Sequence, residues 1–126
     1  MLVENAADVA VAMSNVSQES DIVAIGLFKI TDPLLQGTPD YITFAKSFEP
    51  TASYFDLGVR YNQLTAGKAA TLNRYFIQNM VDAGKTFKIN VPFKSVPVDS
   101  STYDEVHYLL SRGYRLLADD ITLVPR

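Results

Sequence analysis

"TAGKAATLNRYFIQNMVDAGKTFKINVPF", residues 65–93, predicts one long helix followed directly by a strand. Within the helix, 66–83, apolar side chains recur at helical spacing, Thr65 is placed to cap the first turn, and Gly84 to close the last. The apolar stripe consists of Ala69, Leu72, Phe76 and Met80. In the strand, 86–93, every second side chain is apolar, which is typical of a strand with one face on a core.

Upstream of this helix, the sequence predicts three strands. Residues 21–31 form a run of β-branched and aromatic side chains, the pattern of a central strand that is covered on both faces. Residues 41–48 and 53–61 alternate apolar and polar side chains, as strands with one exposed face do. Thr38 followed by Pro39 also favours a helix start before 41–48, so both interpretations stay open there.

A second helix and a hairpin are predicted in the C-terminal part. The helix, 102–113, has Ser101 or Thr102 as its cap, acidic residues in its first turn and an Arg-Gly end, all of which suit the helix dipole. Two short strands then flank a turn at 118–120. The order of elements predicts an α+β domain over 21–126, with an antiparallel or mixed sheet of five to six strands and two helices packed on one face.

Residues 1–20 are predicted to form an N-terminal helix or an arm. A helix that begins near Asn5 has an apolar stripe of small residues on one side. The stripe consists of Val9, Met13 and Val16. Because such a stripe packs weakly on its own, the segment either docks on the sheet or reaches a neighbouring molecule.

The composition narrows the classes of function. The chain of 126 residues has no cysteine, which excludes disulfides, thiolate metal ligands and cysteine nucleophiles. The net charge is −3 and the basic residues are scattered from Lys29 to Arg126, so we expect no nucleic-acid partner. The N-terminus lacks the basic start of a signal peptide, and the longest strongly apolar stretch, 22–28, is too short to cross a bilayer. We therefore expect no membrane partner, and a location in the cytoplasm or in a particle assembled there.

The pair Gly67 and Lys68 is the nearest approach to a nucleotide-binding motif. A phosphate-binding loop needs another glycine five residues before this pair and a hydroxyl residue after it. Asn62 and Ala69 stand in those places, so we predict no nucleoside triphosphatase. The remaining alternative is a weak anion site at the N–H groups of Ala66, Gly67 and Lys68, although an ordinary surface lysine is the favoured interpretation.

No catalytic or metal-binding set is predicted. Asp104, His107 and Ser111 have the composition of a catalytic triad, but side chains from successive turns of one helix point in parallel, so we expect a solvated helix face. Asp119 and Asp120 are favoured turn residues and lack the spaced partners of a metal site. We therefore expect no cofactor and no enzyme activity.

The lack of a chemical motif favours a structural protein that works through protein–protein interaction. We predict an assembly subunit, of the kind found in oligomeric rings and as a virion component of viruses or phages, with copies of itself or other subunits as partners. The candidate interface residues are Val9, Met13, Val16, Tyr54, Pro92 and Val96. Two alternatives stay open: a small ligand-binding or catalytic domain that uses the anion site, and a regulatory module that binds by strand addition or charge mimicry.

Overall fold

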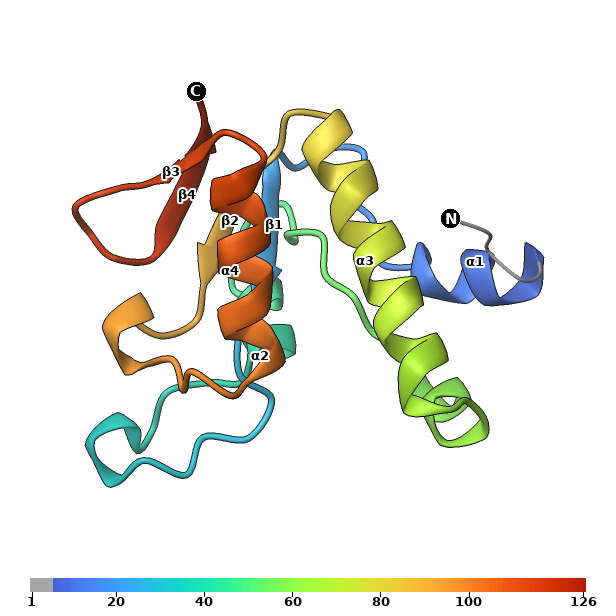
Figure 1. Ribbon diagram of the computed structural model, residues 1–126, viewed down its shortest axis with the longest axis horizontal. Coiled ribbons are helices and arrows are strands. Elements are labelled where there is room, and N and C mark those ends of the chain that lie inside the picture. The colour runs from blue at the N-terminus through green and yellow to red at the C-terminus, as the bar shows by residue number, and fades with distance from the viewer. Residues whose placement is uncertain (1–5) are drawn as a thin grey trace.

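Four strands form one mixed sheet in the computed structural model of the protein, which describes residues 6–126 (Figure 1). The order across the sheet is β1-β2-β4-β3, in which β1 and β2 are parallel and the other neighbours are antiparallel. The strands are β1 Ile22–Ile25, β2 Thr86–Ile89, β3 Tyr114–Leu116 and β4 Thr122–Pro125. The prediction of an α+β domain with a mixed sheet is confirmed, but the described residues form four strands instead of five to six.

Four α-helices accompany the sheet in the described part of the chain. They are α1 Ala6–Ala12, α2 Tyr41–Lys46, α3 Ala66–Asp82 and α4 Ser101–Ser111, and the short 3-10 helices are η1 Pro33–Leu35, η2 Gly58–Gln63 and η3 Phe93–Ser95. The predicted cap of α3 forms, because the Thr65 hydroxyl accepts a hydrogen bond from the Lys68 amide at 3.2 Å. In α4 the cap is Ser100 instead of Ser101 or Thr102.

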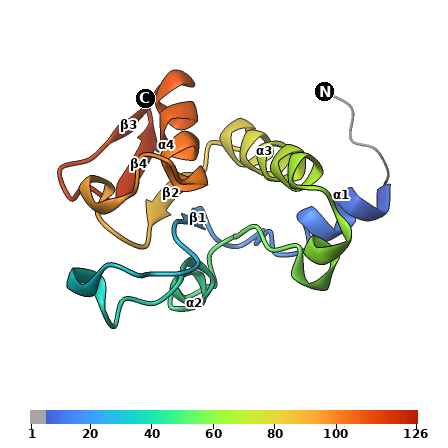
Figure 2. The same ribbon diagram turned by 60° about the horizontal axis from the view of Figure 1, so that its bottom comes forward.

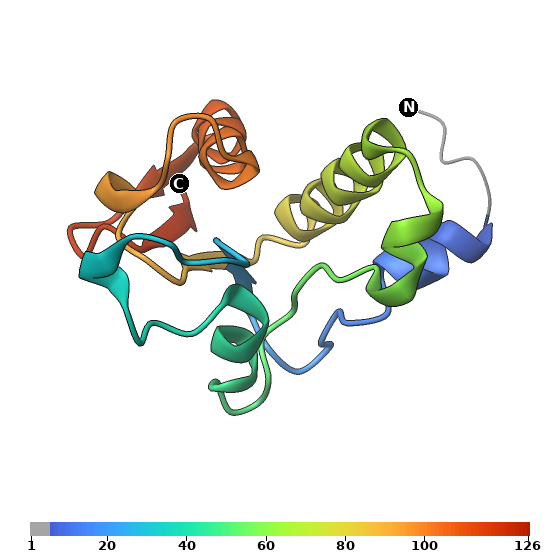
Figure 3. The same cartoon turned by 90° about the horizontal axis from the view of Figure 1, so that it is seen from below.

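The main core lies between the sheet and the helices α3 and α4, which lie on the same side of the sheet in Figures 2 and 3. Alternate strand residues point to this side, and the apolar stripes of both helices close over them. Its buried members include Val23, Ile25, Phe76, Ile77, Met80, Phe87, Ile89, Val106, Leu109 and Leu123. Burial of each large apolar side chain contributes about 2 kcal/mol to folding, so this cluster is the main source of stability.

The opposite face of β1 is covered by α2, which occupies the place of the predicted strand 41–48. Asp40 starts this helix, because its Oδ1 accepts a hydrogen bond from the Thr43 amide at 2.9 Å. The same bond lowers the pKa of the Asp40 carboxyl below its usual value. The contact with β1 is made by small buried residues, Ala24, Ala45 and Ala52. The strand prediction is therefore wrong, and the alternative helix forms with Asp40 instead of Thr38 as its cap.

The predicted strand 53–61 is also wrong. Ser53 alone pairs with β1: its amide donates to the Ile22 carbonyl at 2.9 Å, and its carbonyl accepts from the Ala24 amide at 2.8 Å. The chain leaves the extended conformation at Gly58, where η2 begins. The φ of Gly58 is 58°, in the left-handed region that glycine adopts most readily. One bridge and a helical turn thus replace the expected strand.

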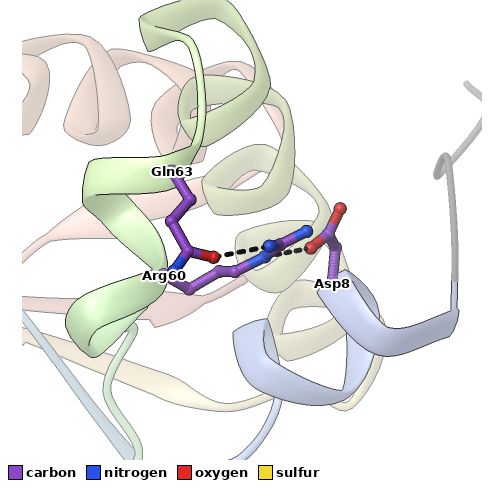
Figure 4. Close-up of polar contacts among 3 residues, drawn as sticks. All are labelled: Asp8, Arg60 and Gln63. Atoms are coloured by element: carbon purple, nitrogen blue, oxygen red, sulfur yellow. Dashed lines mark hydrogen bonds and ion pairs between the residues drawn. The ribbon is translucent and has the colours of Figure 1, made fainter.

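The described part of the N-terminal segment docks on α3 of the same chain (Figure 3). Ala12 of α1 is fully buried in this contact. Beside it, Arg60 of η2 donates from Nε to the buried Asp8 carboxylate and from Nη1 to the Gln63 side chain, both at 2.7 Å (Figure 4). The Arg60 side chain is 36% exposed, but the Asp8 carboxylate is buried, and a buried carboxylate is costly to leave without its partner, so this contact holds α1 against η2. Asn5, where the sequence places the helix start, lies outside the described residues.

Candidate functional site

A cavity of about 890 Å³, called the cleft below, opens beside the end of β1 between α3, the first turn of α4 and η2. Sites for small organic ligands have volumes of roughly 300–1,000 Å³. Aromatic rings form much of the wall, namely Phe28, Tyr41, Phe55, Tyr61 and Phe76. The charged residues that line it are Lys29, Asp56 and Glu105. The cleft therefore combines an apolar wall with a few polar groups.

The cleft borders β1 because the strand ends sharply at Gly26. This glycine has a φ of 143°, and a Cβ atom there would lie 2.0 Å from Oδ1 of Asn90. The Asn90 side chain accepts from the Leu27 amide and donates to the carbonyls of Leu27 and Pro39, each at 3.0 Å. These bonds hold the residues after β1 beside the cleft. Both parallel strands stop here, several residues before their predicted ends.

Two polar side chains join α3 and α4 at the wall of the cleft. Asn73 of α3 donates a hydrogen bond from Nδ2 to Oε2 of Glu105 on α4. Removal from water raises the pKa of Glu105 from 4.5 to about 7, while the Asn73 bond and the charge of Arg74 oppose the shift and Asp104 adds to it. Near neutral pH this carboxyl is therefore present in both protonation states and can accept or donate a hydrogen bond.

A further polar group reaches the cleft from α2. The Tyr41 hydroxyl donates to the Phe55 carbonyl at 2.5 Å. The pKa of Tyr41 lies well above its usual value, first because the hydroxyl is buried and then because of the negative charges of Asp56 and Glu105. The side chains of Asp56 and Glu105 line the same cleft as this hydroxyl.

Comparison with protein-family models, with curated proteins and with solved structures found no match to this chain. In the part of the chain that the structure describes, no helix combines the length and the apolar character needed to cross a membrane. Nor does any group of three or more His, Cys, Asp or Glu side chains within residues 6–126 have an arrangement that could hold a metal ion. The chemistry of the cleft is therefore inferred from its own side chains.

The sequence-predicted anion site lies only partly in the cleft. Ala66 lines the cleft, whereas Gly67 and Lys68 do not. The Lys68 amide donates to the Thr65 hydroxyl, which caps α3. One of the N–H groups expected to face an anion is thus used by the helix itself.

His107 and its helix neighbours lie outside the cleft. Asp104, His107 and Ser111 are all exposed on α4. The His107 ring contacts the Tyr103 ring with 4.5 Å between their centroids, and the Ser111 hydroxyl donates to the Tyr108 carbonyl at 2.6 Å. His107 and Ser111 therefore have separate partners, and the structure places all three residues on a solvated helix face.

Asp119 and Asp120 hold the turn between β3 and β4. Asp119 accepts from the amides of Ile121 and Thr122 through Oδ1 and from the Thr122 hydroxyl through Oδ2. These bonds lower the pKa of Asp119, the hydroxyl bond most. Asp120 has a φ of 63° and accepts from the Lys94 amide at 3.0 Å. The Asp119 carboxylate thus stabilises the turn, and the Asp120 carboxylate connects the turn to η3.

The predicted interface residues are all buried or half-buried, and their role in contacts between molecules stays a prediction. Tyr54 and Val96 are buried, and the half-buried ones are Val9, Met13, Val16 and Pro92. The exposed large apolar residues of the described chain are others, namely Phe28, Leu34, Tyr61, Val98 and Leu110. Of these, Phe28 and Tyr61 line the cleft. Part of the exposed apolar surface therefore belongs to the candidate site.

Sequence reasoning missed Asn73 and Glu105, although each interrupts an apolar stripe. Asn73 lies four residues after Ala69 and three before Phe76. Glu105 lies four residues before Leu109. A polar side chain at such a position faces the packed side of its helix and needs a partner there. The sequence thus contained a signal for both residues, but their contact across 32 residues depends on how the helices pack.

Proposed function

We propose that this protein binds a small organic molecule in the cleft. The observation that supports this most is the cavity of about 890 Å³ whose wall combines aromatic rings with the hydrogen-bonded pair of Asn73 and Glu105. Ligand sites in proteins are mostly apolar, with a small number of fixed polar groups. A carboxyl group in a cleft with a strongly raised pKa is another feature of functional sites.

The polar groups of the cleft already have fixed positions. Asn73 holds one oxygen of Glu105. The Tyr41 hydroxyl is bound to the Phe55 carbonyl, and the Asp56 carboxylate accepts a backbone N–H at 2.9 Å. A ligand therefore meets groups that need little ordering, which favours affinity. That the protein has no enzyme activity remains a prediction from the sequence.

The test uses a substitution that places a large side chain in the cleft. Ala70 is exposed and lines the cleft, whereas Ala83 is exposed at the end of α3 and does not line it. We expect a fragment library of neutral, anionic and cationic compounds to yield binders whose NMR shifts saturate. Ala70→Trp should abolish this binding, because the indole occupies the cavity, and Ala83→Trp should leave it unchanged. No binders, or binders that Ala70→Trp leaves unaffected, would refute the proposal.

The assembly role predicted from the sequence is a second proposal, and two exposed loops favour it. Leu34 is 92% exposed and Val98 is 74% exposed, so a contact between subunits would remove both apolar side chains from water. Light scattering of the full-length chain and of a Leu34→Asp, Val98→Asp double variant tests it. A defined oligomer that the variant dissociates would support it, and a monomer in both would exclude self-assembly through these loops. The regulatory module remains a prediction without such an observation.

A further inference from the structure

We propose that the ligand of the cleft is an organic cation, a protonated amine on an apolar or aromatic body, held by aromatic rings and by the carboxylates of Asp56 and Glu105. This inference rests on the proposed function and names the chemical class of its ligand. Its basis is the combination, in one cavity, of five aromatic residues with carboxylates on two different elements. Such a combination complements a positive charge that carries apolar groups.

The aromatic rings in the wall of the cleft suit a cation that carries an apolar body. Phe28 and Tyr61 line the cleft yet remain 62% and 60% exposed, so a ligand that covers them removes apolar surface from water. Phe28 also meets the Tyr41 ring edge to face, with 6.4 Å between centroids. Rings present their negative faces to cations and attract an ammonium group that lies near such a face. The wall thus favours a cation with an apolar body over a small hydrated anion.

The carboxylates of Asp56 and Glu105 suit the charge of such a ligand. In the described structure, Glu105 accepts its hydrogen bond through Oε2 and Asp56 accepts its bond through Oδ1, so Oε1 and Oδ2 remain as acceptors for a ligand. The Tyr41 hydroxyl is directed to the Phe55 carbonyl and does not donate to either carboxylate. An ammonium group supplies several N–H donors together with a positive charge.

The cationic side chains near the cleft do not donate hydrogen bonds to these two carboxylates among the described contacts. Arg74 follows Asn73 on α3, but its guanidinium lies over the Tyr108 ring, 4.3 Å from the centroid, and Arg74 does not line the cleft. Lys29 does line the cleft, and it is exposed on the segment after β1. Neither donates a hydrogen bond to Glu105 or Asp56 among the described contacts. The charge of Arg74 acts on Glu105, but neither carboxylate accepts a hydrogen bond from a cation among the described contacts, and a ligand cation can supply one.

Three probes with the same phenyl body separate charge from shape: 2-phenylethylamine, 2-phenylethanol and 3-phenylpropanoate. We titrate each into the full-length protein at about pH 8, where the amine is protonated and Glu105 is ionised, and follow NMR shifts. We expect the amine to bind at least about tenfold more tightly than the alcohol, and the propanoate more weakly than both. Glu105→Gln should reduce amine affinity about tenfold and leave alcohol affinity unchanged. Glu19→Gln, at an exposed glutamate that does not line the cleft, is the matched control and should change neither.

A second measurement uses only the wild type, so it does not depend on whether Glu105→Gln folds. In the wild type, amine affinity should rise as pH increases through about 7, because ionisation of Glu105 creates the charge that the amine meets, while alcohol affinity stays flat. Besides Glu105, the charged and titratable groups near it or in the wall of the cleft are Arg74, Asp104, Asp56, Lys29 and Tyr41. Equal or tighter binding of the alcohol or propanoate, or a flat amine profile, would overturn the inference and leave the proposed function standing. Failure of compounds of every charge to bind would instead refute the proposed function.

Discussion

The two halves of α3 differ in how they meet the rest of the molecule. The C-terminal half places the large side chains of Ile77 and Met80 in the main core. The N-terminal half presents the small side chains of Ala66, Ala69 and Ala70 to the cleft, and Phe76 at the junction belongs to both regions. Because helix geometry is fixed, large side chains close the space to the sheet and small ones leave it open. One helix thus stabilises the core with one half and lines the cleft with the other.

Loss of packing in the C-terminal half is expected to have the largest effect. Ile77 is 1% exposed, so Ile77→Ala should lower the free energy of unfolding by about 3–4 kcal/mol through lost apolar contacts and a new cavity. Ala70→Leu in the other half should change it by less than about 1 kcal/mol, because the cleft accommodates the added atoms. Urea denaturation measures both. Similar losses for the two variants would mean that the halves do not differ in packing.

Beside the cleft, the backbone conformation of Gly26 should also make a large contribution to stability. Gly26→Ala places a Cβ atom 2.0 Å from Oδ1 of Asn90 at a φ of 143°. We expect it to lower the free energy of unfolding by about 2–3 kcal/mol, because Asn90 must give up its bonds to the loop. The matched control is Gly67→Ala in the first turn of α3, where a Cβ atom meets nothing within 4 Å. A Gly26→Ala variant as stable as this control would contradict the role assigned to Asn90.

The Glu105 carboxyl should make stability depend on pH. Its pKa is about 7 in the folded protein and 4.5 as a reference, so the folded state binds more protons between these values and the free energy of unfolding falls as pH rises through this window. We expect a loss of about 2 kcal/mol, reduced by partial contact with water. Glu105→Gln should match the wild type below about pH 4 and exceed it at about pH 8.

Thermal or urea unfolding of the wild type and Glu105→Gln at several pH values measures this difference, and other titrating groups cancel between the two proteins. Curves that stay parallel across the whole range would show that Glu105 is not perturbed by burial.

The smallest expected effect concerns α2, which brings Tyr41 to the cleft. Asp40→Ala removes the cap and should cost about 1 kcal/mol, measured by urea denaturation. Asp32→Ala, which removes the cap of the exposed η1, serves as the control and should cost less than about 0.5 kcal/mol. If both losses are equal, α2 contributes no more to the fold than an exposed loop does.

Local patterns predicted the parts of the fold that rest on local rules. The helix of 66–83 follows from its stripe and its Thr65 cap, and the hairpin follows from its turn residues. The segment 41–48 alternates like a strand, but one hydrogen bond from the Thr43 amide to Asp40 favours a helix there. A period-two pattern over eight residues is too short to outweigh such a cap.

The cleft was harder to predict because it depends on packing between distant segments. Its wall combines the end of β1, α2, η2, α3 and the start of α4. Asn73 and Glu105 were visible as polar interruptions of two stripes, but the pairing of α3 with α4 on one face decides that they meet. The volume of the cavity follows from small residues such as Ala66 and Ala70, whose effect appears only once the neighbouring elements are in place.

An NMR titration of the full-length protein with 2-phenylethylamine, followed at the side-chain amide of Asn73, tests the central claim most directly. The account predicts a saturable shift of this amide, because Asn73 lines the cleft and is bound to Glu105. The shift should disappear in Ala70→Trp and persist in Ala83→Trp. If the NMR signal of the Asn73 amide does not shift, up to the highest amine concentration used, the claim that this cleft is a binding site for such a ligand is contradicted.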